Sequence, residues 1–127
     1  MMDQPSMHEL VEAVRQFLET KAMPELKGHT AFPARVAANA LGIVARELER
    51  GAASSNAESR RLKALLNRDG SLEELNRELC AQIRSGKLDI ASTPLEKHLE
   101  LTTFDKVSID QQNYSGLKIT QSRQEKA

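Results

Sequence analysis

The sequence predicts an all-α protein, a bundle of about five helices in up-and-down order around a central helix at about residues 31–50. Three observations predict this class. Apolar residues recur at helical spacing in several segments, no strand-like alternation extends beyond a few residues, and helix-capping residues stand at the segment ends. Only 3% of the residues are aromatic, so the core must consist of Leu, Ile, Val and Ala.

The central helix is predicted from the segment TAFPARVAANALGIVARELERG, residues 30–51. Its apolar residues cover about half of the helix circumference, whereas a surface helix needs only a narrower stripe. We therefore expect this helix at the centre of the bundle. Pro33 fits its first turn, and Gly51 is expected to end it as a C′ residue.

The flanking helices are predicted from their capping signals. Ser6 and Glu9 form a capping box that opens a helix ending near Ala22, before Pro24. After a polar loop at residues 52–57, a short helix is expected over residues 58–67.

The second half of the chain contains similar signals. Ser71 and Glu74 form a second capping box, and Pro94 marks the first position of a fifth helix. The polar stretch from Thr120 is expected to be disordered. We thus predict one helical domain at residues 1–119 and a disordered tail at residues 120–127.

Charge and cysteine content limit the classes of partner. The chain has 18 basic and 18 acidic residues and a formal net charge of zero. This balance argues against nucleic acid as a partner and permits self-association. With Cys80 as the single cysteine, no secretory signal and no apolar run of about 20 residues, we expect a cytoplasmic protein without membrane contact.

The sequence contains no signature of a metal or cofactor site. The three histidines lack ligand partners at helical spacing, so we expect neither metal nor cofactor. Cys80 lies at the flank of an apolar stripe and is interpreted as a buried, inert thiol. Arg60, Arg61 and Lys63 form a basic cluster that we interpret as a solvated face.

The candidate site lies along one edge of the central helix, and we call it the polar seam: Arg35, Asn39, Gly42 and Arg46. Asn and Gly are unfavourable inside helices, which suggests a close approach by another backbone. We favour an intrachain brace. The alternative is an anion-binding or catalytic pocket formed by Arg35, Asn39, Arg46 and Glu47. Glu47 projects into the apolar arc and is expected to pair with Arg50 or with an arginine of another helix.

The fifth helix predicts an interface. Leu95, Leu99, Thr102 and Ile109 share one face, whereas Leu101 and Phe104 point to nearly the opposite side. Either the C-terminal segment around Tyr114 and Leu117 or a second copy of the chain must cover these two residues. The zero net charge favours a homodimer through Leu101 and Phe104.

A resemblance adds a class of partner. The runs Arg35–Leu41 and Arg46–Gly51, with flanking segments at residues 10–14 and 83–89, resemble a family of small bacterial helical proteins of unknown function. Members of that family are encoded near aminoglycoside-phosphotransferase-like kinases and acyl-CoA dehydrogenases. The resemblance implies a non-enzymatic accessory protein that binds such a kinase or dehydrogenase. The alternative function is that of a small-molecule binding or catalytic domain at the polar seam.

Overall fold

The computed structural model describes residues 3–126, and the regular structure in that range is helical throughout. The all-α class is therefore confirmed. The chain divides into two compact units, residues 1–51 and residues 52–127. The single domain at residues 1–119 stays a prediction. The helices are α1 (Met7–Phe17), α2 (Met23–Glu25), α3 (Ala31–Leu66), α4 (Leu72–Arg84), α5 (Thr93–Asp110) and α6 (Ser115–Lys126).

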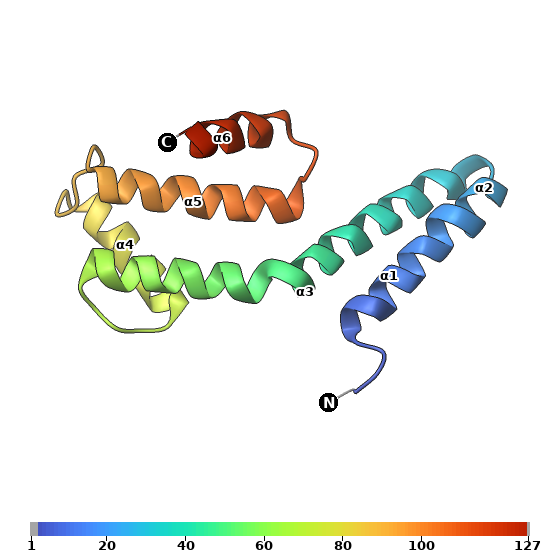
Figure 1. The fold of residues 1–127 in the computed structure, drawn as a ribbon, viewed down its shortest axis with the longest axis horizontal. Helices are drawn as coiled ribbons and strands as arrows, with labels where there is room; N and C mark the ends of the chain where they lie inside the picture. The colour runs from blue at the N-terminus through green and yellow to red at the C-terminus, as the bar shows by residue number, and fades with distance from the viewer. Residues whose placement is uncertain (1–2, 127) are drawn as a thin grey trace. The chain divides into compact units, whose positions relative to one another are not determined.

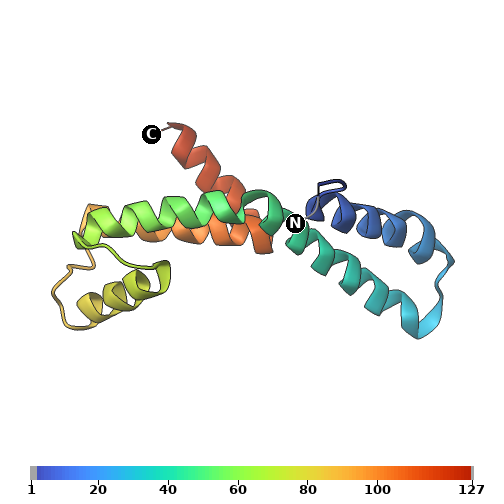
Figure 2. The ribbon, with the colours of Figure 1, turned by 90° about the horizontal axis from the view of Figure 1, so that it is seen from below.

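The N-terminal unit is a helical hairpin, in which α1 and the first half of α3 lie side by side and antiparallel (Figures 1 and 2). The predicted capping box is confirmed at the start of α1. The backbone N–H of Glu9 donates to Ser6 Oγ over 3.2 Å, and that of Ser6 donates to Glu9 Oε2 over 2.7 Å. Helical structure continues past the expected end, through a π-helical turn at Leu18–Ala22 and through Pro24 in α2.

Helix α3 corrects the prediction for the central helix. It runs without interruption through Gly51 and through residues 52–57, where we expected a loop. Gly51 lacks the left-handed backbone of a C′ glycine; among the described residues, Gly28, Gly70 and Gly86 are the glycines with positive φ. The expected loop contains three alanines, and Ala is the residue that most favours a helix.

Within the hairpin unit, the first half of α3 buries a narrower side than its apolar arc predicted. The buried side of this half carries small residues, Ala38, Gly42 and Ala45. Four of its large apolar side chains are 40–71% exposed: Phe32, Val36, Val44 and Leu48. The broad apolar arc therefore reflects an exposed surface on the hairpin in addition to a packing face.

The C-terminal unit contains a leucine core formed by α3, α4 and α5. Leu62, Leu75, Leu79 and Leu95 are at most 3% exposed, and five further apolar residues pack around them. Helix α4 begins at the predicted capping box of Ser71 and Glu74, which is confirmed. This unit therefore has the large, buried aliphatic side chains that the hairpin lacks.

Helix α6 packs on α5 (Figure 1). It extends from Ser115 to Lys126, so residues 120–126 are helical where we expected disorder. Leu117 is buried and anchors this helix, and the following residues include neither Pro nor Gly. Phe104 and Leu117 line one groove, so the C-terminal segment lies near Phe104. A homodimer through Leu101 and Phe104 stays a prediction. Leu101 is half-buried and does not line this groove.

Candidate functional site

The polar seam lies on the hairpin unit, and its members differ in exposure. Arg35 and Asn39 are exposed, Gly42 is buried and Arg46 is half-buried. A Cβ atom at Gly42 would lie 3.2 Å from Nη1 of Arg46 and 3.8 Å from Cδ of Arg15. The space above Gly42 is therefore filled by two arginine side chains of the same unit.

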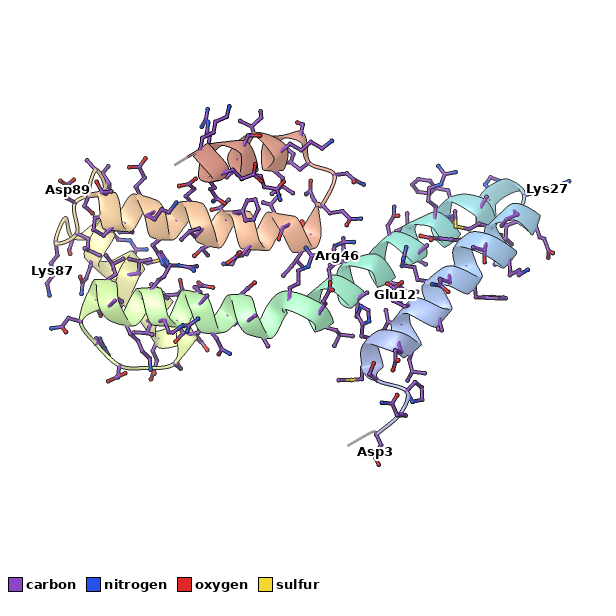
Figure 3. The ribbon with its side chains drawn as sticks, in the orientation of Figure 1. Asp3, Glu12, Lys27, Arg46, Lys87 and Asp89 are labelled. Atoms are coloured by element: carbon purple, nitrogen blue, oxygen red, sulfur yellow. The ribbon has the colours of Figure 1, made fainter. Side chains whose placement is uncertain are left out.

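Arg15 of α1 lies beside the polar seam, a neighbour that the sequence did not predict. Its guanidinium pairs with Glu12 at 2.8 Å and with Glu19 at 2.9 Å, both on its own helix. The hydrogen bond from Arg15 lowers the pKa of Glu12, and the bond to Glu12 raises the pKa of Arg15. Figure 3 labels Glu12 on α1 and Arg46 on α3. Charged groups from both helices thus line the hairpin contact.

Glu47 does not make the predicted pair with Arg50. Arg50 pairs with Glu49 at 3.3 Å, and Glu47 is exposed. The carboxylate of Glu47 instead lies where a Cβ atom at Gly51 would stand. The prediction assumed a bundle packed around this helix, and the exposed side of α3 removes the need for a buried partner. A ligand site formed by Arg35, Asn39, Arg46 and Glu47 stays a prediction.

Helix α1 carries an exposed apolar stripe. Met7, Leu10, Val14 and Phe17 are separated by three, four and three residues, the spacing of a coiled-coil seam. Their exposed fractions lie between 43% and 63%. The residues of α1 that are partly buried lie on an adjacent side and include Val11 and Arg15. The coiled-coil stripe of α1 therefore has no helix packed on it within the hairpin.

Helix α3 carries a second stripe next to its own buried side. Leu41, Val44 and Leu48 lie beside the buried Gly42 and Ala45, one residue earlier in the chain. On α1, Leu10 stands in the same relation to Val11. A two-fold axis normal to the plane of two antiparallel helices exchanges the helices and keeps each side of that plane in place. Side chains one position before the contact residues therefore lie on the same side of the plane in both helices. Both stripes therefore lie on one side of the hairpin, and together we call them the apolar face.

The C-terminal unit contains a polar cluster of six side chains, of which Glu58 and His98 are buried and the other four partly buried. Its members come from α3, α4 and α5: Glu58, Arg61, Asn76, His98, Thr102 and Asp105. Asn76 donates to Glu58 Oε1 over 3.0 Å, while Arg61 donates to Thr102 Oγ1 over 3.1 Å. Arg61 also lies 3.9 Å from Asp105. This cluster links the three helices beside the leucine core.

His98 is the most buried polar member, at 3% exposure, and its Nδ1 atom has no hydrogen-bond partner among the described residues. Burial lowers its pKa, and the charge of Arg61 lowers it further. The sequence did not predict this cluster: His98 has no ligand partner at helical spacing, and Arg61 lies in a basic cluster expected to be solvated. A signal was present: His98, Thr102 and Asp105 occupy the helical stripe that begins at Leu95 and ends at Ile109.

An apolar groove lies between α5 and α6. Its volume is about 560 Å³, and its apolar lining includes Leu99, Phe104, Tyr114 and Ile119. Leu99, Tyr114 and Ile119 are 46–57% exposed. The groove therefore presents apolar surface to solvent on the C-terminal unit.

Cys80 corrects a prediction, because it is exposed on α4 and is not a packing residue. Among residues 3–126, no group of three or more His, Cys, Asp and Glu side chains is arranged to hold a metal ion. Within the same range, no helix has the length and apolar character needed to span a bilayer.

The comparisons with known proteins identify a family and no activity. The family model described as a domain of unknown function (DUF6285) matches residues 24–114. This range includes α3, α4, α5 and the whole polar cluster. Neither the curated proteins nor the solved structures contain a significant match.

Proposed function

Because this chain belongs to the DUF6285 family of domains of unknown function, we propose from its surface chemistry that it is a non-enzymatic interaction protein. The proposed docking surface is the apolar face of the hairpin. No catalytic role is assigned to the polar cluster, whose side chains link helices of the C-terminal unit to one another.

The observation that supports this function is the exposed stripe of α1. On this helix of 11 residues, four large apolar side chains at coiled-coil spacing are exposed to solvent. Burying one such side chain contributes roughly 1.5–3 kcal/mol. Exposed apolar patches of this kind typically mark protein interaction sites. The stripe therefore favours a helical partner that packs on it.

The resemblance supplies two candidate partners, an aminoglycoside-phosphotransferase-like kinase and an acyl-CoA dehydrogenase encoded nearby. Purified full-length chain can be titrated against each enzyme by biolayer interferometry. We expect Val14→Asp to weaken binding about 100-fold, because a charge would be buried in the contact. Phe32→Asp is the matched control, since Phe32 is 71% exposed on another side of the hairpin.

The proposal fails if Val14→Asp and Phe32→Asp bind a partner as tightly as the natural chain. It also fails if, in a monomer, the apolar face proves to be covered by other residues of the same molecule. Hydrogen exchange of the α1 amides and binding of a hydrophobic dye measure that cover, in a sample that sedimentation shows to be monomeric.

The alternative function, anion binding at the polar seam, has a separate test. If Arg35, Asn39 and Arg46 hold a carboxylate or phosphate, then inorganic phosphate or citrate should raise the melting temperature of the natural chain. Arg35→Gln should remove that increase, while Arg50→Gln should retain it. An equal response in both variants would exclude a site at the seam.

A further inference from the structure

We infer that the occupant of the apolar face is a second copy of this chain, and that two hairpins pair to form a four-helix bundle. This inference rests on the proposed docking function of the hairpin. It names the partner, which the proposed function leaves open.

The composition of the hairpin core favours a second copy. In residues 3–51 the buried side chains belong to alanines, Ala38 and Ala45, packed beside Gly42. The C-terminal unit, in contrast, buries four leucines almost completely. A two-helix hairpin that buries only small residues gains little from the hydrophobic effect, so it needs a further apolar layer for stability.

The geometry of the apolar face fits a second hairpin. It carries two parallel stripes, one from each helix, with the 3–4 spacing of knobs-into-holes packing. A surface with two such stripes is half of a four-helix bundle, and the other half must also supply two stripes. A second hairpin, related by a two-fold axis, supplies two stripes of the same spacing and length.

The apolar face also has a limited exposed area. Six of its large side chains are 40–63% exposed: Met7, Leu10, Val14, Phe17, Val44 and Leu48. At about half of the ~60–120 Å² that an aliphatic side chain can bury, and of the ~150–250 Å² for Phe17, they present roughly 200–400 Å² of apolar surface. A standard interface buries about 800 Å² per partner, of which about 60% is apolar, or roughly 500 Å². The six side chains thus supply about half or more of that apolar area, so the face has the size of a small dimer interface.

The small net charge of the hairpin also permits pairing. Residues 1–51 contain seven acidic and six basic side chains, so the net charge of the hairpin is −1. The four residues of the α1 stripe, which runs from Met7 to Phe17, are all uncharged. Two copies can therefore approach without the repulsion that a strongly charged hairpin would impose.

The test is the mass of the full-length chain by sedimentation equilibrium from low to high micromolar concentration. We expect twice the monomer mass of 14.1 kDa. Val14→Asp and Leu48→Asp, one on each stripe, should each weaken the dimer roughly 100-fold. Each substitution is present in both copies, so it buries two charges in the interface. Phe32→Asp should remain dimeric. Circular dichroism checks that the variants keep their helices.

Two results would overturn the inference. One is a monomer at high micromolar concentration. The other is a dimer that persists in both Val14→Asp and Leu48→Asp, which would place the contact elsewhere. In the monomer case, dye binding and rapid exchange of α1 amides would leave the docking function standing with a different protein as partner. A monomer with protected α1 amides and no dye binding would overturn the docking function as well.

Discussion

His98 makes the stability of the chain depend on pH. Its pKa is lowered in the folded state by burial, then by Arg61 and Lys106, against the opposing effect of Glu58. Below about pH 6.5 the unfolded chain therefore binds a proton at this residue that the folded chain does not. The free energy of unfolding should fall as the pH decreases through 6.5, by at most about 1.4 kcal/mol per pH unit, and this loss ends at the folded pKa.

Urea unfolding at pH 7.5 and pH 5.5 measures this effect. His98→Gln should reduce the pH dependence, whereas the exposed His29→Gln should retain it. The carboxyl groups of Glu9, Glu12 and Glu74 have lowered pKa values, so their titration lies below this window. An unchanged pH dependence in His98→Gln would assign the effect to other groups.

Cys80 gives a second prediction for a single residue. Because its side chain is exposed on α4, it should react with a maleimide or disulfide reagent in the native protein. We expect a native rate within about tenfold of the rate in denaturant, as read by mass spectrometry. Cys80→Ser should give no labelled product. Protection by several orders of magnitude would restore the interpretation of a buried thiol.

At the scale of elements, Gly51 tests the continuity of α3. Inside a helix, Gly51→Ala should stabilise the chain by about 0.5–1 kcal/mol, because Ala loses less backbone entropy on folding. The added methyl group meets the carboxylate of Glu47, which is exposed and can turn away.

Gly86→Ala is the matched control, because Gly86 has φ +76° and open space around its Cα. That change should destabilise the chain by about 1 kcal/mol. Thermal unfolding of both variants measures the difference. Destabilisation by both changes would mean that Gly51 ends a helix, as the sequence first suggested.

The elements also show which features can be predicted from sequence. The capping boxes at Ser6 and Ser71 were predicted correctly, because their contacts lie within four residues. The end of α3 was wrong, because a glycine inside a helix and a C′ glycine look alike in sequence. The polar cluster was missed, because Glu58, Asn76 and His98 meet only through tertiary packing.

For the whole molecule, the two units differ in what stabilises them. The C-terminal unit has its own core, centred on Leu62, Leu75, Leu79 and Leu95. The hairpin depends on its apolar face being covered, which by our inference requires a second copy. Its stability should then follow mass action, while that of the C-terminal unit should not.

We therefore expect the full-length chain to unfold in two steps in urea. Hydrogen exchange should show α1 opening first, at a urea concentration that rises as the protein concentration increases. The amides of α4 should open later, at a midpoint independent of protein concentration. In Val14→Asp the first step should move to lower urea, and the second should not move. A single transition that depends on concentration throughout would mean that the two units unfold as one and that dimerisation stabilises both.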